Sequence, residues 1–247
     1  MPYYKAIIEY NGKNYSGFQK QPNLRTIEDS LNKAISKFSN NIVTIKYAGR
    51  TDSGVHAKGQ VISFKLAKKY NNHQICAGIN FHLRENNEEI AILKVNKSDK
   101  DFNPRFGAKE KTYEYQILNR EIFSPLLSDY SWHIKKNINI KAMQIASNYL
   151  IGKHDFSAFR ASECQAEKPI RVINNIKITK TKNIIRISIT APSFLYNMVR
   201  IISGTLVEIG LEKYKPEKIK EILISKNRKN AGQTAPAKGL CLIKIKY

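Results

Sequence analysis

One order of secondary-structure patterns, strand, helix, strand, strand, helix, strand, runs twice through this chain. Strand patterns alternate apolar and polar residues, and helix patterns place apolar residues three or four positions apart. In the first half we expect strands at residues 3–10, 43–47, 62–66 and 89–95, with helices at 27–39 and 75–83. In the second half we expect strands at 111–118, 172–179, 184–190 and 240–246, with helices at 140–151 and 195–209 and an added helix at 216–224.

This repeated order is the signature of the split β-α-β, or ferredoxin-like, unit. We therefore predict an α+β fold of two tandem ferredoxin-like halves, residues 1–104 and 105–247, whose antiparallel sheets flank a basic cleft. The halves share the order of their elements and show no sequence identity with each other. A cleft between two sheets would suit a groove for RNA.

The charge of the chain points to a polyanionic partner. There are 42 Lys and Arg against 20 Asp and Glu, a formal net charge of +22. An AT-rich genome could enrich Lys, but codon bias alone does not halve the number of acids. The basic residues are spread along the chain, which indicates a folded basic surface for nucleic acid and not a charged tail.

A Gly-rich loop at residues 49–59 is the best functional clue. It places one carboxylate, Asp52, between the guanidinium of Arg50 and the imidazole of His56. Strand patterns flank it, and loops carried on paired strands often hold functional residues. Asp52 could simply form the turn. The neighbouring Arg50, however, favours an ionised carboxylate, which can serve as a nucleophile or a base.

A metal site or a nucleotide-triphosphate site is not expected at this loop. Asp52 and His56 have no second cluster of acids or histidines nearby that would complete a metal site. Gly49 and Gly54 have the spacing of a phosphate loop, but Val55 and His56 stand where Lys and Ser or Thr would be needed.

Cysteine usage and hydropathy predict a cytoplasmic protein. Cys76, Cys164 and Cys241 are odd in number and lack CxxC spacing, which fits a reducing compartment. No stretch approaches the roughly 18 uninterrupted apolar residues of a membrane helix, so we expect no membrane association.

Two further residues have both a structural and a functional interpretation. Tyr113 and Tyr115 lie on one face of a predicted strand, where they could pack or pair across strands. Tyr113 could instead stack on an extruded base and offer a hydroxyl for proton transfer. Arg200 lies off the apolar stripe of its predicted helix and could be an ordinary surface cation.

At these residues the chain resembles the bacterial tRNA pseudouridine synthase A family. The Gly-Arg-Thr-Asp-Ser-Gly-Val-His-Ala run at 49–57 is close to the signature of that family, and the resemblance is collinear over the whole chain. The other motifs that carry it are residues 8–12 (Ile-Glu-Tyr-Asn-Gly), 17–21 (Gly-Phe-Gln-Lys-Gln), 102–106 (Phe-Asn-Pro-Arg-Phe), 111–113 (Lys-Thr-Tyr), 156–160, 194–204 and 238–240.

The resemblance implies a role for each candidate residue. Asp52 matches the catalytic aspartate, Arg50 the arginine that fills the gap left by the flipped uridine, and Tyr113 the tyrosine that stacks on the base. Arg200 matches the arginine that pairs with the aspartate, and Leu240 a residue that lines the uracil pocket. We also place His56 among the substrate-binding residues, because it lies within the signature.

The implied activity is isomerisation of uridine to pseudouridine at positions 38, 39 and 40 of the tRNA anticodon arm, by a homodimer. This reaction has no redox change and no hydrolysis, so we expect no cofactor and no metal. Asp52 could attack the substrate as a nucleophile or remove the C2′ proton to give a glycal, and the sequence does not choose between these routes.

The chain departs from the family pattern at two positions. Phe18 replaces the usual Trp of a Gly-Trp-Gln motif, and Arg84 stands where a Pro generally ends the second helix.

A non-catalytic tandem RNA-binding module is the main alternative function, but the aromatic-rich strand motif of such modules is missing. A nuclease would need an acidic metal cluster.

Overall fold

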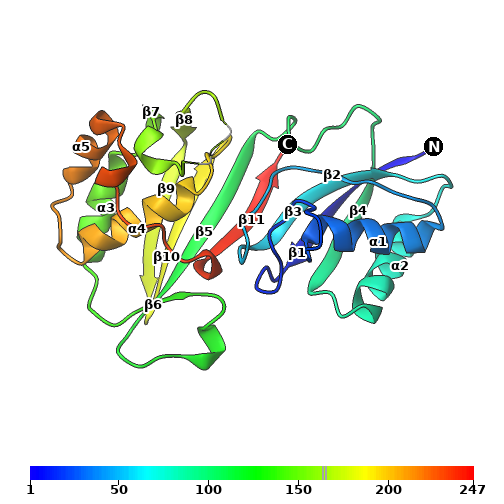
Figure 1. Ribbon diagram of the computed structural model, residues 1–247, viewed down its shortest axis with the longest axis horizontal. Coiled ribbons are helices and arrows are strands. Elements are labelled where there is room, and N and C mark those ends of the chain that lie inside the picture. The colour runs from blue at the N-terminus through cyan, green and yellow to red at the C-terminus, as the bar shows by residue number, and fades with distance from the viewer. Residues whose placement is uncertain (163, 165) are drawn as a thin grey trace. The chain divides into compact units, whose positions relative to one another are not determined.

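The computed structural model describes residues 1–162, 164 and 166–247. The chain divides into two compact units. Unit 1 comprises residues 1–109 and 242–247, and unit 2 comprises residues 110–241. Within the described residues the structure is mixed α/β, with mostly antiparallel strand pairs and five α-helices (Figure 1). In that same part of the chain, each helix is too short or too polar to span a bilayer.

Strand β1 (Tyr3–Tyr10) is central in the sheet of unit 1. It pairs antiparallel on one side with β3 (His56–Lys65) and on the other with β4 (Ile90–Ser98). The short β2 (Lys46–Tyr47) pairs antiparallel with β3, and β11 (Leu240–Lys246) also neighbours β3 through its later residues. Every second side chain of β1 is buried, from Tyr4 to Tyr10, so one face of this sheet forms the core.

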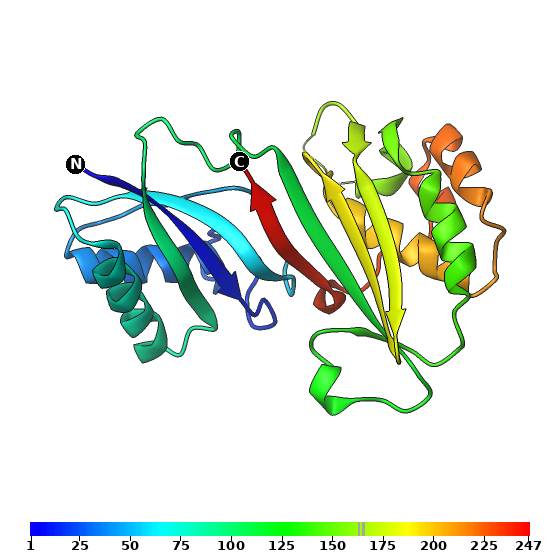
Figure 2. The same ribbon diagram turned by 180° about the vertical axis from the view of Figure 1, so that it is seen from behind.

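Helices α1 (Ile27–Ser39) and α2 (Asn72–Glu85) lie side by side on one face of this sheet (Figures 1 and 2). Their buried residues recur every three or four positions, as expected for a helix with one apolar stripe. Thr26 caps α1 by accepting from the backbone N–H of Asp29 at 3.4 Å. Asn71 and Gln74 form a reciprocal capping box at the start of α2.

In unit 2, β5 (Glu110–Asn119) pairs antiparallel with β10 (Ile184–Ala191), and β10 pairs antiparallel with β9 (Asn175–Thr181). The short β6 (Trp132–Ile134) runs parallel to the end of β5. A separate two-stranded ladder consists of β7 (Gly152–Asp155) and β8 (Ile170–Ile173). The buried isoleucines of β10 alternate with half-buried residues, so this sheet also has one core face.

Three helices, α3 (Ile140–Asn148), α4 (Met198–Gly210) and α5 (Lys218–Ser225), cover the core of unit 2. Helix α4 is buried on nearly every side, because its sequence is apolar almost all round. Single turns of 3₁₀ helix occur at Pro125–Leu127, Ser157–Phe159, Arg228–Asn230 and Ala237–Gly239.

Most predicted elements are confirmed, and β1, α1 and β11 begin and end at the predicted residues. The predicted strand at 43–47 is wrong over its first part. Val43 and Ile45 are buried, but their backbone N–H groups donate to side chains of α1, at 2.9 Å to Ser36 and 3.0 Å to Asn32. Only the last two residues pair as a strand.

Three other expectations need correction in unit 2. The predicted strand at 172–179 is two strands, because β8 pairs with β7 and β9 pairs with β10. The predicted helix at 140–151 ends at Asn148, where the chain tightens into turns before Gly152 at φ +104°. The predicted helix at 195–209 begins only at Met198, because Asn197 is left-handed at φ 59°.

Candidate active site

The Asp52 loop lies in unit 1, between β2 and β3. The backbone N–H of Val55 donates to the carbonyl of Asp52 at 3.1 Å, which closes a four-residue turn. The third residue of this turn, Gly54, has φ +76°, a conformation that suits glycine. Asp52 is half-buried and Arg50 is exposed. The loop thus presents its charged side chains from a backbone that is fixed by turn chemistry.

His56 lies at the base of this loop, at the first position of β3, and only 6% of it is exposed. Its Nδ1 accepts a hydrogen bond from the backbone N–H of Gly12 at 3.1 Å. An acceptor nitrogen carries no proton, so Nδ1 of this ring is deprotonated in this arrangement. One ring nitrogen of His56 therefore has a structural partner, and a direct contact of the ring with substrate stays a prediction.

The segment at residues 10–18 packs along the Asp52 loop. The hydroxyls of Tyr10 and Thr51 share a hydrogen bond of 2.8 Å. The backbone N–H of Phe18 donates to the carbonyl of Thr51 at 3.0 Å. Gly17, at φ +90°, comes so close that a Cβ there would lie 3.1 Å from the same carbonyl oxygen. This close approach and the positive φ both favour glycine at position 17.

Phe18, the departure from the family pattern, is fully buried beside this loop. Its ring lies 4.5 Å from that of Tyr47 and 6.0 Å from that of Tyr10, between ring centroids. The ring of Phe18 therefore fills this part of the core between aromatic neighbours, as the larger ring of the usual Trp would.

Tyr47 is a residue of this site that the sequence analysis did not single out. Burial, and then the charge of Glu28, raise the pKa of the Tyr47 hydroxyl, and a hydrogen bond with Arg50 opposes that rise. The alternating pattern of Tyr47 marked it only as a strand residue, so sequence offered no signal for this contact.

Arg200 in unit 2 is held by its own surroundings and is not a freely solvated surface cation. Its Nε donates to the carbonyl of Ala235 at 2.8 Å, and its Nη1 donates to Oδ1 of Asn197 at 2.8 Å. The backbone N–H of Ala235 in turn donates to the carbonyl of Arg200 at 3.2 Å. The guanidinium is thereby fixed against the segment that follows α5.

The two strand tyrosines of β5 differ in their surroundings. Tyr115 is fully buried, and its hydroxyl donates to the carbonyl of Pro236 at 2.8 Å. Burial raises the pKa of Tyr115, and the charge of Arg200 opposes that rise. Tyr113 is only half-buried, and its ring meets that of Phe194 edge-on at 5.3 Å. The packing interpretation therefore holds for Tyr115, and the stacking role of Tyr113 stays a prediction.

Leu240 begins β11 and is 5% exposed. The preceding Gly239 lies against the ring of Tyr115, and a Cβ at Gly239 would be 2.6 Å from Cζ of that ring. Tyr115 thus contacts the segment before Leu240 at both Pro236 and Gly239. Tyr115 therefore positions this segment, a role that its place in a predicted strand did not indicate.

The six predicted site residues divide equally between the units. Arg50, Asp52 and His56 belong to unit 1. Tyr113, Arg200 and Leu240 belong to unit 2. Within unit 1 a hydrogen bond from Gly12 holds the ring of His56, and within unit 2 the carbonyl of Ala235 holds the guanidinium of Arg200. Their catalytic and substrate-binding roles stay predictions.

Comparisons with known proteins match nearly the whole chain. A family model described as tRNA pseudouridine synthase matches residues 6–107 and 146–247. A curated protein named tRNA pseudouridine synthase A from Ehrlichia chaffeensis is 47% identical over 247 residues, which cover 99% of each chain. Proteins of the same name from Ehrlichia canis and Wolbachia pipientis wMel are each 44% identical, with 99% of each chain covered. The chain belongs to the tRNA pseudouridine synthase family.

Proposed function

We propose that this protein isomerises uridine to pseudouridine in the anticodon stem-loop of tRNA, at positions 38, 39 and 40. The observation that carries the proposal is the Asp52 loop, which presents one carboxylate beside Arg50 in a chain that belongs to the tRNA pseudouridine synthase family. The net charge of +22 supports a polyanionic substrate.

The reaction breaks the C1′–N1 bond, rotates the uracil and forms a C1′–C5 bond. The proton on C5 is lost and N1 gains a proton, so substrate and product are isomers. No electrons are exchanged and no water is consumed, which is why we propose a reaction without a cofactor or a metal. Asp52 acts either as the nucleophile or as the base that removes the C2′ proton.

The uracil must leave its stack before it reacts, at a cost of a few kcal/mol. We assign to Arg50 the role of filling the vacated space, and to Tyr113 the role of stacking on the extruded base. We assign to Arg200 the pairing with the catalytic carboxylate, to Leu240 a place in the uracil pocket and to His56 a substrate-binding role.

We further propose that both units are ferredoxin-like halves around a basic cleft. In unit 1 the order β4-β1-β3-β2 with α1 and α2 supports this description, and in unit 2 the order β5-β10-β9 with α3 and α4 does so. A cytoplasmic location and a homodimer are part of the same proposal, which rests on the resemblance to the family.

Tritium release from tRNA labelled at C5 of uridine tests the function. Release requires that C5 become the new attachment point, so a nuclease or a passive RNA-binding module would release none. We expect the wild-type protein to release tritium, and we expect the product to map to positions 38, 39 or 40. Binding of tRNA without release would favour the non-catalytic module, and release that maps elsewhere would contradict the assigned positions.

A further inference from the structure

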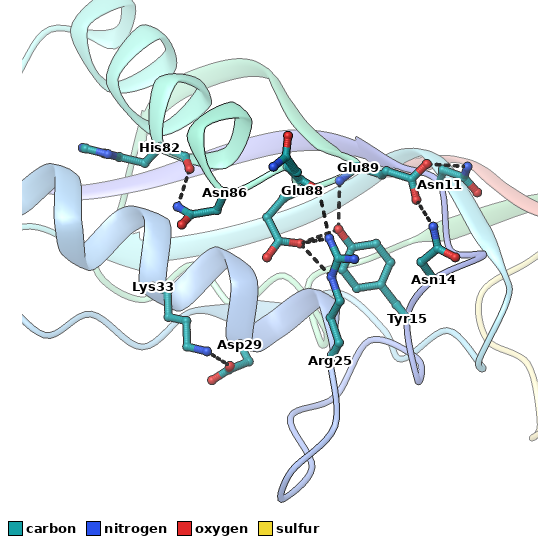
Figure 3. A network of polar contacts seen from close by, with 11 residues as sticks. Asn11, Asn14, Tyr15, Arg25, Asp29, Lys33, His82, Asn86, Glu88 and Glu89 are labelled. Atoms are coloured by element: carbon teal, nitrogen blue, oxygen red, sulfur yellow. Dashed lines mark hydrogen bonds and ion pairs between the residues drawn. The ribbon is translucent and has the colours of Figure 1, made fainter.

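A cluster of polar side chains around the buried Tyr15 in unit 1 lies outside the six predicted site residues (Figure 3). At its centre is Tyr15, which is 2% exposed. Its hydroxyl donates to Oε2 of Glu88 at 2.6 Å and accepts from the backbone N–H of Glu89 at 2.9 Å. Both partners belong to the turn between α2 and β4, more than seventy positions away in the sequence.

Arg25 completes this cluster. Its Nη2 and Nε donate to Oε2 of Glu88 at 2.8 Å and 3.2 Å, and its guanidinium lies 4.8 Å from the centre of the Tyr15 ring. Burial would raise the pKa of Glu88, but hydrogen bonds from Tyr15 and Arg25 lower it below its ordinary value. Oε2 of Glu88 thus accepts hydrogen bonds from two side chains, and the charge of the carboxylate makes such bonds stronger than neutral ones.

The adjacent carboxylate fastens the start of the same segment. Nδ2 of Asn11 donates to Oε1 of Glu89 at 3.1 Å, and Nδ2 of Asn14 donates to Oε2 at 2.9 Å (Figure 3). The turn between α2 and β4 therefore holds the chain at residues 11, 14, 15 and 25 through two neighbouring carboxylates.

The backbone of the same segment contacts the Asp52 loop. The carbonyl of Tyr15 accepts from the hydroxyl of Ser53 at 3.1 Å, immediately after Asp52. Gly12 donates to His56, and Gly17 and Phe18 contact Thr51, immediately before Asp52. The side chain of Tyr15 thus binds the Glu88 carboxylate, and its backbone carbonyl binds the Asp52 loop.

We propose that Glu88, acting through Tyr15 and Arg25, is a positioning residue for the Asp52 carboxylate. This inference rests on the proposed function for its kinetic part. Glu88 fixes the segment at residues 11–18, and that segment fixes the backbone on both sides of Asp52. A misplacement of about 1 Å at a reacting group can cost about a hundredfold in rate.

The kinetic test compares Glu88→Ala, Glu88→Gln and a matched control, Glu85→Ala. Glu85 also contacts polar side chains, Lys37 at 2.7 Å and His82 at 3.3 Å, but neither of these partners belongs to the segment at residues 11–18. We expect Glu88→Ala to lower the single-turnover rate on saturating tRNA by about ten- to a hundredfold, with tRNA affinity within about twofold. Glu88→Gln keeps an acceptor for Tyr15 and should recover part of the rate, and Glu85→Ala should match the wild type.

A second measurement does not depend on activity. Hydrogen exchange of the backbone amides at residues 49–57 should rise in Glu88→Ala and stay unchanged in Glu85→Ala, at a temperature where both variants are fully folded. An inactive wild type with this exchange pattern would overturn the proposed function and leave the positioning contact standing. Unchanged exchange at 49–57, or a wild-type rate in folded Glu88→Ala, would overturn the inference.

Discussion

The backbone N–H of Gly12 donates to Nδ1 of His56 at 3.1 Å, and this contact joins the residues after β1 to the first residue of β3. Both groups are buried, so the N–H has no alternative partner in water if the ring is lost. The contact should therefore be measurable as stability.

Replacement of His56 by Leu should lower the free energy of unfolding by about 1–3 kcal/mol, because a buried donor is left unsatisfied. His56→Asn can place Oδ1 near the position of Nδ1 and should lose less. Urea denaturation of both variants measures the difference. Equal losses in the two variants would mean that volume, and not the acceptor, is what Gly12 needs.

Asp52→Asn should lower the rate of pseudouridine formation by at least about a hundredfold, because the amide can act neither as nucleophile nor as base. The turn should persist, since it depends on the Asp52 carbonyl and on Gly54. Tritium release, the thermal midpoint and tRNA affinity should be measured on the same preparation. Substantial turnover by the purified variant would return Asp52 to the role of a turn former.

Tyr113→Phe keeps a ring for stacking and removes the hydroxyl, whereas Tyr113→Ala removes both. The ring meets Phe194 edge-on and is only half-buried, so neither change should unfold unit 2. We expect Tyr113→Ala to lose more turnover than Tyr113→Phe, by about 1–3 kcal/mol of stacking energy. Wild-type rates in both variants would leave Tyr113 with packing alone.

The Glu88 carboxylate should make stability depend on pH in the acid range. Its pKa is lowered from the ordinary value of 4.5 in the folded state, so its contribution is present above that value and is lost as pH falls through the folded pKa. The difference in thermal midpoint between wild type and Glu88→Gln should thus be largest near neutral pH and should shrink below about pH 4. A difference that stays constant down to pH 3 would contradict this assignment.

Affinity for tRNA should fall linearly on a log-log plot against salt concentration. Lys65 and Lys94 pair with Tyr3 and Ile7 and so lie on the face of the unit 1 sheet opposite α1 and α2. Replacement of both lysines by Ala should make the slope shallower by about one unit each, and an unchanged slope would exclude this face from the phosphate contacts. Arg50→Ala should lower turnover and leave the slope unchanged, and a changed slope would assign Arg50 to the RNA backbone.

The sequence predicted correctly those elements whose structure is set by residues close together in the chain. Apolar periodicity located the helices, and the Gly-rich run located the Asp52 turn. The pattern at residues 43–45 misled because side chains of α1, and not a neighbouring strand, satisfy that backbone.

The supporting tyrosines could not be predicted in the same way. Tyr15 meets Glu88 across 73 positions of sequence, and Tyr115 meets Pro236 across 121. Neither partner stands at a spacing that a helix or a strand would bring together. Only the folded backbone reveals which of the many tyrosines support the segments that hold the predicted site residues.

The chain is not synthesised in the order in which its units are completed, because unit 1 includes residues of the last strand, β11. Residues 242–247 belong to unit 1, where Lys109 donates to the carbonyl of Lys246 at 2.8 Å and Tyr247 donates to the carbonyl of Pro104 at 2.9 Å. A ribosome makes all of unit 2 before it makes these residues. Unit 1, although synthesised first, therefore cannot complete the β3 edge of its sheet until residues 242–247 have been translated.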